Sequence, residues 1–335
     1  MARNCFNRFV LASTRPVAMP IAVYPGLALT GAKVCDVVTN PQAQFDAQVA
    51  LHDRYRTPFV LSAMDLSAEA EAFGCTLHLS ETEIPTVTGR LVASLEQAQK
   101  LSVPQPGDKR TAVYLETVRR LRRLPEKPLV FGGCIGPFSL AARLVGVSEA
   151  MEMTVTEPDL MHLLLEKCTA FLTAYLRAFR QAGADGVVMA EPAAGLLSPR
   201  SLSQLSSAYI KSIGTAMADG HFAIILHNCA AKVLHLPAML ETGLHSFHFG
   251  APMDLVAALG KVPADVVVCG NLDPSGVFVQ SSPAEITARV MELMKATAAR
   301  RNFVLSSGCD VPPATPLDNL DAFYLALKIM PAPRR

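Results

Sequence analysis

Short apolar runs alternate with longer amphipathic segments along almost the whole chain. Glycine and proline separate the two kinds of segment repeatedly, and the apolar runs are continuous rather than alternating with polar positions. Continuous apolar runs of this kind are typical of strands in a parallel sheet that is buried on both faces. The pattern predicts eight strands, at residues 17–24, 59–63, 129–133, 186–190, 223–227, 246–249, 266–269 and 303–306.

Helix-like segments lie between these strands, at residues 42–55, 109–122, 157–182, 201–217, 234–242, 253–259, 283–299 and 317–329. Strands that alternate with helices are parallel, because each crossover carries the chain back to the start of the next strand. A closed barrel pairs both edges of such a sheet. We therefore predict an α/β protein: a single (β/α)8 TIM-barrel domain over residues 1–335, with an N-terminal helical addition. A doubly wound open sheet is the alternative, but no G-x-G-x-x-G motif follows the first predicted strand.

The composition excludes several classes of function. Half of the 335 residues are apolar and 18% are charged, which favours a large core over disorder. The formal net charge of +1, the absence of tryptophan and an aromatic content of 6% argue against a nucleic-acid-binding protein. No apolar run is long enough to span a membrane, and the first residues do not resemble a signal peptide, so we expect a cytoplasmic protein. Its eight cysteines then indicate thiols or metal ligands rather than disulfides.

Three residues with metal-ligand chemistry follow predicted strands. His227 and Cys229 are two positions apart at the end of the fifth strand, so their side chains point to the same side of an extended segment. Cys309 follows the eighth strand, and the strand ends carry the active site of a barrel. One imidazole and two thiolates suit Zn²⁺ and leave its fourth position open, as in catalytic zinc sites. A chance His-x-Cys pair beside a buried apolar cysteine is the alternative interpretation.

The charge of such a site indicates its chemistry. Zn²⁺, two thiolates and a neutral imidazole sum to zero, and a substrate thiolate would bring the total to −1. A metal lowers the pKa of a bound thiol, and the sulfur then stays electron-rich. This arrangement favours alkyl transfer to a thiol over hydrolysis.

Other polar residues at strand ends are candidates for the same site. Asp65 is either catalytic or the N-cap of the following helix. Glu191 is a catalytic candidate that could instead orient His227 or cap a loop. Asn271, in GNLDP, either contacts the substrate or cofactor or builds the turn. Cys134 and Cys269 are alternative ligands or small core residues at the top of the barrel.

The strings HNC, GNLDP and SSGCDVPPATPLDN resemble the uroporphyrinogen decarboxylase superfamily. Within it, residues 58–324 are similar to the zinc-dependent branch of methylcobamide:coenzyme M methyltransferases. The resemblance implies a (β/α)8 barrel with zinc held near its mouth by His227, Cys229 and Cys309. It also implies transfer of a methyl group from a methylated corrinoid to a zinc-activated thiol such as coenzyme M. Some members add a glutamate ligand after the sixth strand, where this chain offers His245, His248 or water and no carboxylate before Asp254.

The resemblance also defines the expected partners. No D-x-H-x-x-G segment, which would ligate cobalt, is present, so we expect a separate corrinoid protein or free methylcobalamin, together with a small thiol acceptor. Arg143 and Arg200 are candidates for holding an anionic acceptor, or are surface residues. Two other functions stay open: a metal-free decarboxylase acting on a tetrapyrrole, for which the N-terminal region is poor in arginine, and a non-catalytic component that binds a corrinoid protein. The sequence does not indicate the oligomeric state.

Overall fold

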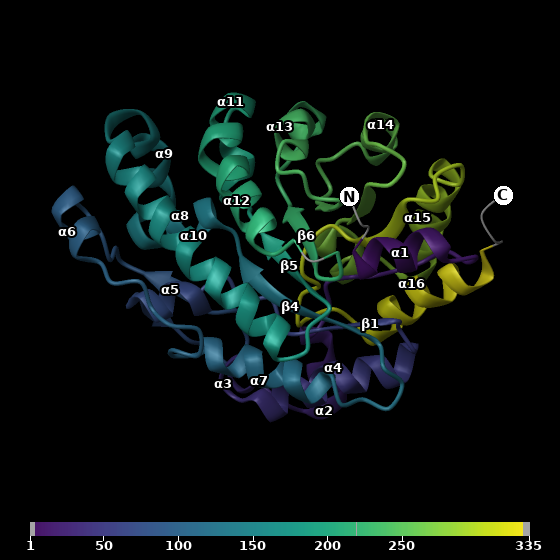
Figure 1. The fold of residues 1–335 in the computed structure, drawn as a ribbon. Coiled ribbons are helices and arrows are strands. Elements are labelled where there is room, and N and C mark those ends of the chain that lie inside the picture. Colours follow the sequence, from purple (N-terminus) through teal and green to yellow (C-terminus); the bar gives the residue numbers. More distant parts are fainter. Residues whose placement is uncertain (1–3, 219, 331–335) are drawn as a thin grey trace.

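The computed structural model describes residues 4–218 and 220–330. Its centre is a curved sheet of seven parallel strands (Figure 1), which confirms the predicted α/β class. Neighbouring strands follow the order β1-β4-β5-β6-β7-β8-β9. Their bounds are β1 Phe59–Leu61, β4 Leu129–Ile135, β5 Gly186–Ala190, β6 Ala223–Asn228, β7 Ser246–Phe249, β8 Val267–Leu272 and β9 Phe303–Ser307.

The eighth barrel position is occupied by an irregular segment. The strand predicted over residues 17–24 is wrong, because only Ala18 forms a parallel bridge, to Leu305 of β9. The Met19 N–H donates to the Leu305 carbonyl at 2.9 Å. Pro20 follows and has no N–H to donate on the opposite side, which faces β1, and a proline within a strand interrupts its pairing. The segment still lies beside β9, where the barrel requires a strand.

Side-chain amides bind the backbone N–H groups at the β1 edge, which faces the irregular segment at residues 17–24. No backbone hydrogen bond in the described part of the chain joins β1 to the segment at residues 17–24. Instead, α4 (Pro41–Tyr55) directs two glutamines at the β1 edge. Gln48 Oε1 accepts from the Leu61 N–H and Gln44 Oε1 from the Ala63 N–H, each at 3.1 Å. Buried N–H groups need such partners, so this helix replaces the missing ladder.

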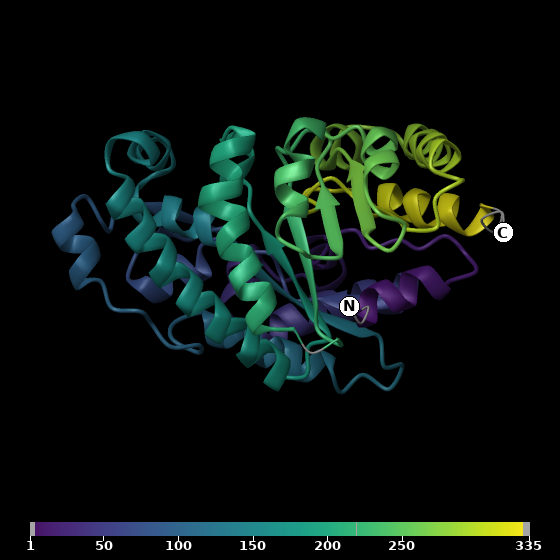
Figure 2. The same ribbon diagram turned by 45° about the horizontal axis from the view of Figure 1, so that its top comes forward.

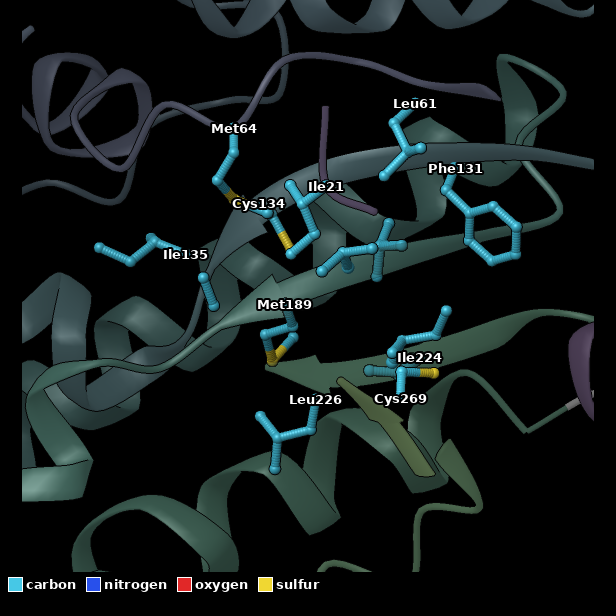
Figure 3. Close-up of a cluster of buried hydrophobic side chains, with 14 of the residues drawn as sticks. Ile21, Leu61, Met64, Phe131, Cys134, Ile135, Met189, Ile224, Leu226 and Cys269 are labelled. Carbon is cyan, nitrogen blue, oxygen red and sulfur yellow. The ribbon is translucent and has the colours of Figure 1, made fainter. Parts of the chain in front are cut away.

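Apolar side chains from several strands fill the interior (Figure 3). Ile21 from the irregular segment, Phe131 from β4 and Met189 from β5 are all buried there. Cys134 and Cys269 belong to this core and lie outside the cluster of ligand atoms described below.

Helices surround the sheet (Figure 1). Most predicted helices are present, although the one expected over residues 201–217 is divided into α11, the π-type turn η3 and α12. The bounds are α7 Thr111–Leu121, α8 Pro137–Val145, α9 Val147–Thr156, α10 Pro158–Gln181, α11 Pro199–Leu202, η3 Ser203–Ser207, α12 Ala208–Ala216, η4 Val233–His235, α13 Leu236–Leu240, α14 Leu255–Lys261, η5 Pro274–Val279, α15 Pro283–Ala296 and α16 Leu317–Ile329. None of the helices in residues 4–218 and 220–330 is both long and apolar enough to cross a membrane.

The N-terminal addition closes the end of the barrel at which the strands begin (Figure 2). Phe6 of α1 (Cys5–Ala12) packs against Phe59 and Phe131, with ring centroids 5.4 and 5.7 Å apart. Asn7 Nδ2 donates to carbonyls on the segments before two further strands. The remaining N-terminal elements are η1 Tyr24–Gly26, α2 Leu27–Thr30 and α3 Val34–Thr39, and the insertion after β1 comprises α5 Ala68–Phe73, the hairpin β2 Thr76–His78 and β3 Thr86–Thr88, and α6 Leu95–Lys100.

Candidate metal centre

Three ligand atoms converge at the end of the barrel opposite α1. His227 lies near the end of β6, Cys229 follows that strand, and Cys309 follows β9. A ring nitrogen of His227 and the two Sγ atoms lie within 4.8 Å of one another. Ligand atoms bound to one tetrahedral ion at ~2.0–2.3 Å are roughly 3.3–3.8 Å apart. The three side chains therefore need little movement to share a divalent ion.

The two thiols interact directly. The hydrogen bond from Cys309 and the neighbouring His227 lower the pKa of Cys229 to about 4, against the opposing effect of burial. The same hydrogen bond, together with burial, raises the pKa of Cys309. A metal ion can take the place of the shared proton, because thiolates rather than thiols are metal ligands.

A second histidine contacts the His227 ring through its Nδ1 atom. His227 in β6 and His248 in β7 are register partners, and their Nδ1 atoms are 2.8 Å apart. His248 Nε2 lies 2.7 Å from Ser306 Oγ, and the Ser306 hydroxyl donates to the Met19 carbonyl at 2.6 Å. Burial, and then the nearby His227, lower the pKa of His248 well below its usual value. His227 Nε2 is buried and has no partner among the described residues.

None of the protein groups considered as a fourth ligand is placed for that role. Both ring nitrogens of His248 are engaged as described above. His245 precedes β7, at the strand end that contacts α1, where its carbonyl accepts from Asn7. Asp254 caps α14 by accepting from the Ala257 N–H at 2.9 Å.

Asp65 belongs to a buried ion-pair network. Its side chain is 0% exposed and pairs with Arg110, which also binds Glu71. Tyr114 donates to Asp65 Oδ2 at 2.7 Å, and both the N–H and the hydroxyl of Ser67 donate to Oδ1. Both carboxylate oxygens are therefore used within the protein, where they tie the end of β1 to α7.

Glu191 caps a helix. Its Oε1 accepts from the Phe138 N–H and the Ser206 hydroxyl, both at 2.9 Å, and its Oε2 accepts from the Ser139 N–H at 2.8 Å. These amides open α8, where a negative charge is favourable. Burial raises the pKa of the carboxyl against these hydrogen bonds. The Glu191 N–H also donates to the His227 carbonyl at 2.8 Å, so Glu191 adjoins the metal centre through its backbone.

Asn271 supports a loop. Its Nδ2 donates to the Gly250 carbonyl at 2.9 Å and to the Met253 carbonyl at 2.7 Å, which ties the end of β8 to the loop that follows β7. Asp273 of the same motif caps η5 by accepting from two backbone N–H groups. These contacts correspond to the turn-building interpretation of GNLDP.

Two charged side chains near the strand ends, Glu69 and Asp310, were not identified as candidates from the sequence, whereas a third, Arg143, was considered there. Glu69 Oε1 accepts from the Ile135 N–H at 3.0 Å, its Oε2 has no partner among the described residues, and burial raises its pKa to about 8. Asp310 follows Cys309, and both of its carboxylate oxygens are buried without a partner in the described chain. Arg143 of α8 is partly buried, and its side chain has no hydrogen bond or ion pair within that same part of the chain. Of the two missed groups, Asp310 carried a signal in the sequence, its adjacency to Cys309, and Glu69 carried none.

Comparison with known protein families identifies the family of this chain. The uroporphyrinogen decarboxylase family model matches residues 15–329. The chain therefore belongs to the uroporphyrinogen decarboxylase family.

Relatives within that match point to two activities. The chain is 30% identical over 269 residues to the methylcobamide:CoM methyltransferase MtbA of Methanosarcina mazei, which covers 79% of this chain and 76% of that protein. It is 27% identical over 317 residues to the uroporphyrinogen decarboxylase of Ectopseudomonas mendocina, covering 90% and 88% of the two chains. The solved structure of a methyltransferase from Methanosarcina mazei has the same fold, with a TM-score of 0.85 and 24% identity over 95% of this chain and 96% of that one.

Proposed function

We propose that this protein is a zinc-dependent methyltransferase that moves a methyl group from a methylated corrinoid to a thiol. The observation that carries the proposal is the convergence of His227, Cys229 and Cys309 on one point at the mouth of the barrel. The similarity to the methylcobamide:CoM methyltransferase of Methanosarcina mazei supports the same conclusion.

The donor set fits zinc. The buried His227 Nε2 has no protein partner among the described residues, and the two sulfurs beside it already share a proton. An unpartnered buried nitrogen is costly unless something binds it, and a divalent ion would bind both it and the sulfurs. Zinc bound to these residues would supply a Lewis acid that keeps an acceptor thiol deprotonated at neutral pH.

In the reaction the carbon–cobalt bond breaks and a carbon–sulfur bond forms. The acceptor loses its thiol proton to solvent, its sulfur takes the methyl group, and the bonding electron pair stays on the corrinoid. The protein's part is positional, because orienting two bulky reactants can supply about 7–11 kcal/mol of the barrier. The methylated corrinoid comes from a separate corrinoid protein or from free methylcobalamin, since the chain carries no cobalt-ligating motif.

Arg143 is the residue we assign to an acidic group on the acceptor. The two arginines considered from the sequence differ in the structure: Arg200 is exposed, whereas Arg143 is partly buried and unpaired within residues 4–218 and 220–330. Burial lowers the pKa of Arg143, and the only charge that raises it is that of Asp65. A desolvated guanidinium without a carboxylate partner favours an anionic ligand.

The test combines metal analysis with turnover. Protein purified without chelators is analysed for zinc and then incubated with methylcobalamin and a panel of thiols, while the loss of methyl–cobalt absorbance is followed. We expect stoichiometric zinc and thiol-dependent demethylation, and Cys309→Ser should lose both. Cys269→Ser, which changes a buried thiol outside the ligand cluster, is the matched control.

The other two functions give different results in this experiment. A decarboxylase would convert a tetrapyrrole substrate without zinc. A non-catalytic component would bind a corrinoid protein without demethylating methylcobalamin. Metal-free protein that remains active, or wild-type protein that fails with every thiol, would therefore overturn the proposal.

A further inference from the structure

The orientation of the hydrogen bonds behind His227 follows from their chemistry. Ser306 Oγ lies 2.6 Å from the Met19 carbonyl oxygen, which can only accept, so the single hydroxyl proton is committed to that bond. Ser306 Oγ must therefore accept from His248 Nε2, which lies 2.7 Å away. His248 accordingly carries its proton on Nε2.

The next step sets the His227 ring. His248 is buried, and none of the hydrogen bonds or ion pairs in the described chain joins its ring to a carboxylate, so it is neutral and its Nδ1 is a bare acceptor. Only His227 can then supply the proton in the 2.8 Å contact between the two Nδ1 atoms. His227 thus has its proton on Nδ1 and a free lone pair on Nε2, the atom without a protein partner.

We infer that His248 and Ser306 are positioning residues that hold His227 in the one neutral tautomer able to bind a metal through Nε2. The inference deepens the proposed function, because it explains how the imidazole is prepared before an ion arrives. The relay runs through β6, β7 and β9 and ends on the irregular segment at the eighth barrel position. A wrong tautomer would place a proton where the ion must bind.

Two changes separate this role from simple packing. Ser306→Ala removes the acceptor for His248 Nε2–H, so His248 can move its proton to Nδ1 and force His227 to carry its own on Nε2. Ser306→Thr keeps a hydroxyl and should restore the wild-type pattern. Ser307→Ala is the matched control, because Ser307 is equally buried and its hydroxyl accepts from the Ile21 N–H, outside the relay.

The first readout is the tautomer itself. Metal-free protein labelled with ¹⁵N at histidine is examined by long-range ¹H–¹⁵N correlation spectra, with His227→Gln and His248→Gln used for assignment. We expect His248 to be protonated on Nε2 and His227 on Nδ1 in the wild type and in Ser307→Ala, and this pattern to be lost in Ser306→Ala. A wild-type His248 protonated on Nδ1 would overturn the inference.

The second readout is zinc affinity, measured by competition with a chromogenic chelator. Loss of a residue that orients a metal ligand typically weakens binding by about 10- to 100-fold. We expect that loss in Ser306→Ala and near-wild-type affinity in Ser306→Thr and Ser307→Ala. Equal affinity in Ser306→Ala and the wild type would refute the inference and leave the proposed function standing. A wild type that binds no zinc would refute the proposed function, and the tautomer spectra would still decide the inference.

Discussion

Replacing Asp65 by asparagine distinguishes a catalytic carboxylate from a structural one. The Asp65 side chain is fully buried and Arg110 is 8% exposed, so neither charge is compensated by water. Asparagine keeps the shape but presents an NH₂ group to Arg110 or Tyr114, both of which donate. Removing one partner of a buried ion pair typically costs ~3–5 kcal/mol when the other charge is left alone, and here Arg110 keeps Glu71 as a second carboxylate partner, which places the cost at the lower end.

We therefore expect Asp65→Asn to lower the free energy of unfolding by roughly 3 kcal/mol, measured by urea titration with intrinsic tyrosine fluorescence and circular dichroism. Asp321→Asn is the matched control. Asp321 also pairs with an arginine, Arg54, and also accepts from a tyrosine, but the two charged side chains are 40% and 39% exposed. Exposed pairs contribute about 0–1 kcal/mol.

The same variant also tests activity. If Asp65 only anchors α7, methyl transfer by Asp65→Asn should remain within a few-fold of the wild type at a temperature where both are folded. A variant with near-wild-type stability and a rate reduced by several orders of magnitude would refute the structural interpretation and restore Asp65 as a catalytic residue.

The next three predictions concern Arg143, Glu69 and the metal ion. Arg143→Gln should raise KM for thiols bearing a carboxylate or sulfonate by about tenfold or more, because charge-assisted hydrogen bonds contribute ~1.5–3 kcal/mol. The kcat and the KM for neutral thiols should not change, and Arg200→Gln is the control. KM values that are equal in Arg143→Gln and the wild type for all thiols would contradict the assignment. Glu69, whose pKa burial raises to about 8 from 4.5, is neutral in the fold, so its contribution to stability is complete below pH 4.5 and declines as the pH rises to about 8. The free energy of unfolding of the wild type, measured with urea, should then fall by up to ~4 kcal/mol relative to that of Glu69→Gln over this pH range. Stability curves of the two proteins that run parallel with pH would contradict this prediction. Chelator-treated protein should regain thiol-dependent demethylation on addition of Zn²⁺ alone, and recovery without added metal would contradict the proposed metal requirement.

The three candidate metal ligands could be predicted from the sequence because their positions depend on local spacing and on the fact that all strands of a parallel barrel end at the same face. His227 and Cys229 share a side of an extended segment, and Cys309 follows another predicted strand. Parallel strands deliver their ends to the same face, so the three positions were expected to meet without knowledge of the packing. The roles of Asp65 and Glu191 were harder to predict, since each depends on a partner far along the chain. Arg110 lies 45 residues beyond Asp65, and the sequence does not show which donors a buried carboxylate will meet.

The relay required information that a single sequence lacks. That His248 stands beside His227 depends on the register between β6 and β7, and a shift by one residue would turn the His248 side chain to the other face. Hydrophobic periodicity locates strands but does not set their register to one residue. From the sequence, His248 was therefore a candidate metal ligand, whereas in the structure its two ring nitrogens contact His227 and Ser306.

The error at residues 17–24 and the geometry of the metal centre have a common physical origin. A regular parallel ladder that continued past Ala18 would offer the Met19 carbonyl to the Ser307 N–H. The pairing with β9 instead becomes irregular before Pro20, and the Met19 carbonyl accepts the Ser306 hydroxyl. That bond commits the hydroxyl proton and sets the direction of the hydrogen bonds that end at His227. The proline that makes this segment a poor strand therefore lies beside the carbonyl on which the orientation of the metal ligand depends.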